Sequence, residues 1–311
     1  DGIIGKCIDF DGTDDYISVG TTAISKLQFE RTDSFSMFAW INYDSTDRCI
    51  VSNFYYQSSS DLVGYDMWIG TNYLKIHIHN SDTNKIVLTS NTTKMVSGNW
   101  YYIGYTYGGV GTAASVNMYV NGVLQTYSTD TDNLGSNSIV SSNQRFMIGR
   151  RAGNQSGYRF DGKIDEVQIW NRALTDNEIQ EKMYQQLIPN YEEGLVAYYQ
   201  FDEGTGLTAY DIAGGHSGEI NGAEYTDELP PDSAEIWGCT DESADNYDVS
   251  ATVNDGTCTF TYQVPSDFLT IQGAISTSND GDIIIVSPGL YVENITITDN
   301  IVLQSEDPLH P

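Results

Sequence analysis

An all-β protein built on an antiparallel β-sandwich is the fold class that the sequence predicts. Short stretches rich in β-branched and aromatic residues alternate with turn residues over the first half of the chain, and no βαβ alternation occurs; this pattern favours a sandwich. Only 18% of the residues are charged and 22 are tyrosine, which is more typical of a loop-rich exported protein than of a helical enzyme. The expected strands are two within Cys7–Val19, then Phe35–Tyr43, Cys49–Asn53, Tyr65–Gly70, Leu74–His79, Lys85–Thr89, Trp100–Tyr107, Ser115–Gln125 and Arg145–Gly149.

The stretch Gly162–Trp170 is expected to be a further strand with one unusual side chain. Asp165 shares a face of this strand with Val167 and Ile169, because successive side chains of a strand point to opposite faces. A carboxylate in such an apolar row is costly unless it has an ion pair, a hydrogen bond or a metal. The sequence therefore predicts that Asp165 has a partner.

A short helix is expected directly after this strand. Thr175 and Glu178 have the spacing of a capping box, in which each side chain bonds the other's backbone N–H group. Apolar residues then recur at helical spacing until Pro189, which cannot continue a helix. We expect one helix over residues 175–188.

Two segments resemble the LamG-like jelly rolls of the concanavalin A-like lectin and glucanase family. They are the opening Phe10-Asp-Gly-Thr-Asp-Asp-Tyr-Ile17 and the strand-to-helix stretch 162–179. The resemblance implies an antiparallel jelly-roll β-sandwich over residues 1–226. Residues 194–226 resemble the first strands of such a unit, although here they follow the helix. We expect them to complete the same sandwich, since the orphaned start of a second domain would expose an apolar strand edge.

The same resemblance implies a calcium ion where the closing strand meets the first strand. Asp165 matches the metal-binding Asp of the family, and Asp11, Asp202 and Asp211 are the carboxylates that we expect the strand order to bring near it. Oxygen ligands favour calcium over zinc. Such an ion would stabilise the fold without taking part in catalysis.

The acidic turn at Asp11 offers a related possibility. Asp14 and Asp15 are close enough in sequence to share a cation with Asp11. Two alternatives stay open, since an Asp in an Asp-Gly turn often bonds its own backbone, and Asp165 could instead cap the amides of a neighbouring turn.

Three further parts are expected after residue 226. Residues 227–237 have the composition of a linker. Residues 238–260 resemble a small acidic module of secreted marine bacterial proteins, in which a Cys239–Cys258 disulfide would close the loop and Asp245, Asp248 and Asp255 are calcium candidates. Residues 261–311 resemble the cap and first rungs of a right-handed parallel β-helix of the pectate-lyase type. Because so few rungs are too short for a stable solenoid, we expect the chain to be a fragment of a longer protein.

Sugar binding is the leading functional expectation, and it comes from the resemblance. Aromatic rings in or beside loops are the candidates for stacking on sugars, whereas Trp40, Trp100 and Trp170 fall inside apolar strands and are expected in the core. His77 and His79 share one strand face and are expected to be solvated. The candidate ligand-binding residues are Tyr55, Tyr56, Trp68, Tyr73 and Tyr158.

Several other functions are disfavoured. A formal charge of −29 repels phosphate backbones and anionic membrane surfaces, which argues against nucleic-acid binding, and no apolar run is long enough for membrane insertion. Hydrolases of the resembled family carry a Glu-x-Asp-x-x-Glu run on one strand, and this run is absent, as is a Gly-x-Ser-x-Gly elbow. We therefore expect no catalytic residues.

The favoured hypothesis is a secreted, extracellular or cell-surface module, stabilised by calcium, that binds a glycan or a cell-surface partner in carbohydrate recognition or adhesion. The alternative is the accessory N-terminal region of a polysaccharide lyase or glycoside hydrolase whose catalytic β-helix lies beyond residue 311. A purely structural spacer is a third possibility. Cys7 and Cys49 either pair with each other or remain two buried thiols.

Overall fold

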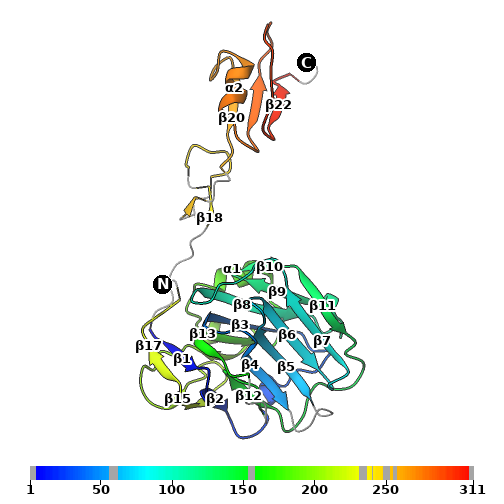
Figure 1. The fold of residues 1–311 in the computed structure, drawn as a ribbon, viewed down its shortest axis with the longest axis vertical. Helices are drawn as coiled ribbons and strands as arrows, with labels where there is room; N and C mark the ends of the chain where they lie inside the picture. Colours follow the sequence, from blue (N-terminus) through cyan, green and yellow to red (C-terminus); the bar gives the residue numbers. More distant parts are fainter. Residues whose placement is uncertain are drawn as a thin grey trace. The chain divides into compact units, whose positions relative to one another are not determined.

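The computed structural model describes residues 5–55, 62–152, 158–230, 237–239, 241–247, 253–254 and 258–307. The chain divides into two compact units, Asp1–Ser233 and Ala234–Pro311. Each unit is described by itself below. Figure 1 shows the strands of the first unit forming two layers.

The first unit is an antiparallel β-sandwich, which confirms the expected fold class. Sheet A has eight strands in the order β10-β9-β8-β3-β13-β1-β17, with β14 also paired to β13. Its strands are β1 (Cys7–Asp11), β3 (Phe35–Tyr43), β8 (Trp100–Tyr107), β9 (Val116–Val120), β10 (Val123–Gln125), β13 (Asp161–Trp170), β14 (Leu195–Tyr199) and β17 (Glu224–Thr226).

Sheet B has nine strands in the order β11-β7-β6-β5-β4-β12-β2-β16-β15. Its strands are β2 (Tyr16–Val19), β4 (Arg48–Tyr55), β5 (Val63–Ile69), β6 (Leu74–His79), β7 (Lys85–Ser90), β11 (Tyr127–Asp132), β12 (Arg145–Ile148), β15 (Thr208–Ala209) and β16 (Gly218–Asn221). Short 3-10 turns occur at Ser25–Leu27, Ala113–Ser115 and Pro189–Tyr191.

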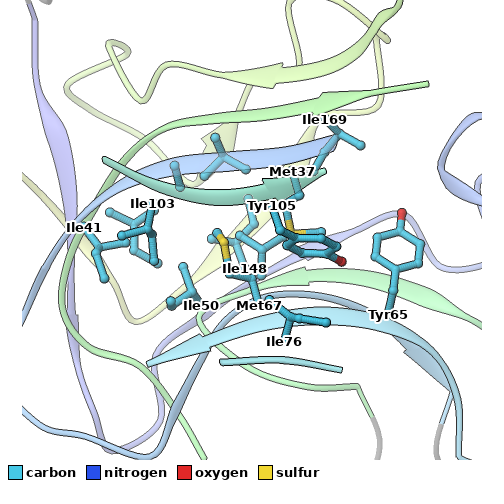
Figure 2. Packing of buried hydrophobic residues seen from close by; sticks show 14 of the residues in the cluster. Met37, Ile41, Ile50, Tyr65, Met67, Ile76, Ile103, Tyr105, Ile148 and Ile169 are labelled. Carbon is cyan, nitrogen blue, oxygen red and sulfur yellow. The ribbon is translucent and has the colours of Figure 1, made fainter. Parts of the chain in front are cut away.

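The main hydrophobic core lies between the two sheets. Figure 2 shows side chains of β3, β8 and β13 pointing toward those of β4, β5 and β6. The core residues mostly alternate along these strands, as the period of a strand requires, except at the register shifts in β4 and β13. Burying each such side chain stabilises the fold by roughly 1.5–3 kcal/mol before entropy is counted. The facing residues include Met37, Ile41, Ile103 and Ile169 from sheet A, and Ile50, Met67 and Ile76 from sheet B.

A second apolar cluster covers the outer face of sheet A and includes the helix α1 (Asp176–Lys182). Trp40 and Trp170 are buried in it, as expected. The capping box of Thr175 and Glu178 is also present. The helix is shorter than expected, because it ends at Lys182 rather than near residue 188.

Tertiary hydrogen bonds explain the early end of α1. The carbonyl of Met183 accepts a bond from Trp40 Nε1 at 2.9 Å, and the amide of Leu187 donates to the hydroxyl of Tyr198 at 3.2 Å. These backbone groups are thus satisfied outside a helix. The apolar side chains of Met183 and Leu187 still pack against sheet A.

The residues that follow α1 extend both sheets of the first unit. β14 pairs with β13, β17 pairs with β1, and β16 pairs with β2, all antiparallel. Ala197, Tyr199 and Ile220 from this segment join the main core. β13 therefore lies between β3 and β1 and also receives β14, with shifts in register near Asp165.

The second unit contains a parallel sheet of β20 (Thr261–Val264), β21 (Ile283–Val286) and β22 (Val302–Ser305), with the helix α2 (Ile271–Thr277) packed beside it. A small parallel pair, β18 (Trp237–Gly238) and β19 (Val253–Asn254), lies in the same unit.

Cys239 and Cys258 form the expected disulfide. Cys7 and Cys49 are both free and buried, so they do not pair with each other.

Candidate functional site

A buried polar layer covers part of the outer face of sheet B, the face that points away from the core. Asp66 and Trp68 on β5, and His77 and His79 on β6, alternate with core residues and so project outward. The register places Asp66 opposite His77. We call Asp66, Trp68, His77, His79 and Arg151 the buried polar layer.

Asp66 is the acceptor at the centre of this layer. Its carboxylate accepts hydrogen bonds from Arg151 Nε and from Trp68 Nε1, the latter at 2.6 Å, and lies 2.7 Å from His77 Nδ1. Burial alone would raise the pKa of Asp66, but the Arg151 charge and His77 outweigh it and hold this pKa at about 2. Asp66 is therefore ionised and paired, as a buried charge needs to be.

Arg151 connects the layer to the aromatic rings around it. Its guanidinium carbon lies 4.5 Å from the ring centroid of Phe54 and 4.5 Å from that of Trp68, within the range of cation–π attraction. The Tyr158 ring lies 4.9 Å from the Trp68 ring. Tyr158 is 41% exposed, so it is the ring of this stack that solvent reaches.

Two sequence expectations about this region are wrong. Trp68 is not an exposed loop ring, since it lies near the end of β5 and is buried beneath Arg151 and Tyr158. His77 and His79 are not solvated, and His79 is only 3% exposed. Burial and the neighbouring His77 lower the pKa of His79 to about 2, so its ring is neutral.

The other expected ligand-binding residues lie elsewhere. Tyr55 is opposite Val63, at the end of the β4–β5 pair away from Trp68. Tyr73 lies in the turn between β5 and β6, where its carbonyl accepts a bond from the Gly70 amide at 2.8 Å. Tyr56 is outside the described residues. Of the expected set, the structure thus brings together Trp68 and Tyr158.

A second candidate site is a group of carboxylates on β13 and the segment after β14. Asp165 is 1% exposed and Glu166 is 2% exposed. The register of β13 against β3 shifts after Asp165, and Glu166 adopts a positive φ of 51°. Asp165 lies opposite Trp40 of the outer cluster, whereas Val167 and Ile169 face the main core, so the expectation that these three side chains share a face is wrong. Asp202 follows β14 and accepts a hydrogen bond from the Lys6 amide at 3.0 Å.

The electrostatics of this group favour a positive partner. Asp165 Oδ1 accepts a bond from the Glu166 amide, whereas Asp165 Oδ2 is buried with no hydrogen-bond partner in the described part of the chain. Burial, the Glu166 charge and Asp202 raise the pKa of Asp165 well above its usual range. Burial raises the pKa of Glu166 to about 8, although the hydroxyl of Tyr198 donates to it.

The strand order does not bring all the expected carboxylates to Asp165, and that part of the prediction is wrong. Asp11 is paired with Asp161, four residues along β13, which corresponds to about 13 Å at the rise of a strand. Both oxygens of Asp211 accept backbone amides, among them those of Tyr198 and His216. Asp211 thus holds its own loop together, and only Asp202 joins Asp165 and Glu166.

Asp11, Asp14 and Asp15 form a separate acidic group in the β1–β2 turn, with one carboxylate oxygen from each within 4.8 Å of the others. Asp11 Oδ1 also accepts bonds from the amides of Thr13 and Asp14. In the second unit, Asp245 accepts a bond from the Thr261 hydroxyl at 2.6 Å. Asp248 and Asp255 are outside the described residues.

The two antiparallel sheets and the core between them define a jelly-roll β-sandwich. The chain belongs to the concanavalin A-like lectin/glucanases superfamily, whose model matches residues 11–180. No curated protein sequence matches the chain.

Several solved structures are similar to the chain. A "putative carbohydrate binding protein" from Bacteroides ovatus is 24% identical, with a TM-score of 0.55, over 74% of this chain and 62% of that protein. The chain thus spans less than two thirds of that protein's length. A pentraxin from Limulus polyphemus is 18% identical over 57% of this chain and 81% of its own, with a TM-score of 0.42.

A third structure is the CBM40 module of the Ruminococcus gnavus IT-sialidase, bound to α2,3 sialyllactose. It is 13% identical over 58% of this chain and 98% of its own length, with a TM-score of 0.41. Of the three, the Bacteroides ovatus protein has the higher TM-score, and at 24% identity its likeness shows a shared fold alone. No helix in the described part of the chain is both long and apolar enough to cross a membrane.

Sequence reasoning missed three important side chains at these sites. Asp66 alternates with the core residues Tyr65 and Met67, so the period of the strand predicts an outward side chain and gives no signal that Asp66 is buried. Arg151 follows a strand and joins Asp66 from 85 positions away, and no local signal indicates that contact. The alternation of side chains in the sequence predicts that Glu166 points toward solvent. In the structure Glu166 is buried, and the register of β13 against β3 shifts at this point.

Proposed function

We propose that the first unit is a non-catalytic carbohydrate-binding module, and that it binds glycans at the outer face of sheet B. The observation that carries the proposal is the exposed Tyr158 ring, stacked on Trp68 and backed by the ion pair of Arg151 and Asp66. A ring held by a rigid charged layer loses little entropy when a sugar stacks on it. Membership of a superfamily that includes lectins supports this proposal.

The experiment is a glycan array followed by titration calorimetry on the strongest hit, with wild type and two variants. We expect Tyr158→Ala to weaken binding by up to about tenfold, since stacking on one aromatic ring contributes roughly 0.5–1.5 kcal/mol. Tyr191→Ala is the matched control, because Tyr191 is 83% exposed on a different turn. Equal affinity of Tyr158→Ala and wild type would place the binding site elsewhere.

We further propose that a calcium ion binds beside Asp165, with Glu166 and Asp202 as the other carboxylates. The unpartnered oxygen of Asp165 and the like charges around it support the proposal, since calcium is bound by several oxygen ligands. The turn of Asp11, Asp14 and Asp15 is the rival position.

Melting curves with calcium and with chelator distinguish the two positions. We expect calcium to raise the melting temperature of wild type and of Asp14→Asn, and to have no effect on Asp165→Asn, because ion binding stabilises only a fold that has the site. If Asp14→Asn alone loses the response, the ion belongs to the turn. If calcium changes none of the curves, neither position binds it.

An accessory role beside a β-helix enzyme is the second candidate function. The parallel strands β20, β21 and β22 begin at residues 261, 283 and 302, and such a repeat of about 20 residues is typical of a solenoid. We propose that this sheet is the start of a right-handed β-helix and that residues 238–260 are an acidic disulfide module with calcium ligands at Asp245, Asp248 and Asp255. The disulfide supports an extracellular or cell-surface location.

A reducing-end assay on a panel of polysaccharides tests the non-catalytic part of the proposal. We expect no turnover by the chain. Turnover that survives repurification and is lost on heating would show an enzyme.

A further inference from the structure

Four arginines gather on three neighbouring backbone segments of the first unit. The Cys49 amide donates to the Tyr158 carbonyl at 3.0 Å, which places Arg48 beside Arg159 along the backbone. The Phe160 amide donates to the Gly149 carbonyl at 2.8 Å, which brings Arg150 and Arg151 alongside. The chain has 14 Lys and Arg against 43 Asp and Glu, so this concentration of positive charge is a local exception.

Two of these guanidinium groups lie against a single ring. The guanidinium carbons of Arg150 and Arg159 are 4.6 Å and 5.5 Å from the centroid of Tyr16. Burial, and then the nearby charge of Arg159, lower the pKa of Arg150. Cation–π attraction to Tyr16 offsets part of the repulsion between the two like charges.

The arginines of this group differ in how they are paired. Arg151 has the carboxylate of Asp66. Arg48 and Arg159 instead donate to the backbone carbonyls of Asp47 and Asp14. In the described residues neither forms an ion pair with a carboxylate, and the Nε of each is buried without a hydrogen-bond partner. A buried N–H donor without an acceptor is costly, so this pair is poised to take an acceptor from a ligand.

We propose that Arg48 and Arg159 bind an oxyanion carried by a glycan, either the carboxylate of a uronic acid or a sulfate ester. The planar fork of a guanidinium matches both groups, with two parallel N–H donors. Arg159 directly follows the exposed Tyr158, so one oligosaccharide chain contacts both residues. This inference rests on the proposed glycan binding and names the class of glycan.

The strong negative charge of the whole chain does not prevent such binding. Charges farther than the Debye length are largely screened, and this length is about 8 Å at physiological ionic strength. A guanidinium group that bonds an oxyanion directly acts well within this distance. The local pair of guanidinium groups therefore dominates once an anionic group has arrived.

Inorganic sulfate tests the arginine site without any assumption about glycans. Melting temperatures are measured in sodium sulfate and in sodium chloride at equal ionic strength, for wild type, the double variant Arg48→Gln/Arg159→Gln and the control Arg31→Gln/Arg145→Gln. The control removes the same charge from arginines outside the group. We expect a rise specific to sulfate in wild type and in the control, and no such rise in the double variant.

Either of two results would overturn the inference: no sulfate-specific rise in wild type, or an equal rise in the Arg48→Gln/Arg159→Gln variant. Arg159→Lys covers the possibility that the double variant folds poorly. Lysine keeps the charge and loses the fork, so we expect its sulfate-specific rise to be smaller than that of wild type.

Titrations with a polyuronate, a sulfated galactan and a neutral glucan then show whether the bound group is a uronic-acid carboxylate or a sulfate ester. We expect the Arg48→Gln/Arg159→Gln variant to bind its anionic glycan tenfold or more weakly and to bind neutral glucan as wild type does. Binding of neutral glycans alone would overturn this inference and leave the proposed function standing. If no glycan of any class binds, the proposed function fails, and the sulfate result alone decides whether the arginines form an anion site.

Discussion

Asp66 is the single residue on which the buried polar layer depends most. Its carboxylate contacts Arg151, Trp68 and His77 on the outer face of sheet B. Removing one partner of a buried ion pair leaves the other charge without compensation. The position of Trp68, and through it that of Tyr158, therefore depends on the charge of Asp66.

We expect Asp66→Asn to lower the free energy of unfolding by about 3–5 kcal/mol, because Arg151 would remain buried without its counter-charge. Denaturant unfolding measures the change. Asp130→Asn is the control, since its pair with Lys75 is half-exposed and surface pairs contribute about 1 kcal/mol or less. Equal losses in the two variants would show that the buried pair has no special role.

The same carboxylate predicts how wild type responds to acid. The pKa of Asp66 is about 2 in the folded chain, below its ordinary value of 3.8. The unfolded chain thus binds this proton first, so the stabilisation is complete above about pH 4 and is lost as the pH falls toward 2. Unfolding measured across this interval is expected to show a loss of roughly 2 kcal/mol from this group that Asp66→Asn lacks.

At the scale of elements, the turn from β13 into α1 combines local and tertiary determinants. Thr175 and Glu178 cap the helix, and Arg172 donates two hydrogen bonds to the Glu178 carboxylate, at 3.0 Å and 2.6 Å. These contacts are close in sequence, which is why the start of the helix could be predicted. Its end is decided by Trp40 and Tyr198, which are distant in the sequence.

Thr175→Ala is expected to destabilise the first unit by about 1 kcal/mol, since it removes the side-chain acceptor of the N-cap. Thr129→Ala is the control, because Thr129 is exposed on β11 and surface substitutions usually change stability by about 0.5 kcal/mol or less. Urea unfolding followed by tryptophan fluorescence measures both. A loss in Thr175→Ala no larger than in the control would mean that packing alone holds α1 in place.

At the scale of the whole molecule, the sandwich needs strands from beyond the segment that matches the superfamily. The match ends at residue 180, yet β14, β16 and β17 pair with β13, β2 and β1. Without them, both sheets would lose paired edges and part of the core. The second unit has its own small core around Val264 and Ile284.

Two shortened chains test this organisation. A chain that ends at residue 230 keeps every strand of both sheets and is expected to retain the main melting transition of the full chain to within about 2 °C. A chain that ends at residue 190 lacks β14–β17 and is expected to lose cooperative unfolding. A cooperative transition in the shorter chain, measured by calorimetry, would show that the returning strands are dispensable.

Much of the fold could be predicted because it follows from local patterns. The alternation of side chains indicates the strands, the Thr175–Glu178 spacing indicates the start of the helix, and the spacing of Cys239 and Cys258 fits the disulfide that forms. The site was less predictable. The face that Asp165 takes depends on the register shift in β13, and the place of Asp11 depends on the register of β1 against β13, neither of which a single strand encodes.

By itself, the sequence determined the sandwich and the capped helix, because both follow from residue spacings within short segments. Only the tertiary structure decided that Asp66 meets Arg151, that Glu166 is buried beside Asp165, and that Arg48 lies next to Arg159. The physical reason is that these contacts join segments far apart in the chain. Their energies depend on burial and on charge, which exist only once the sheets have packed.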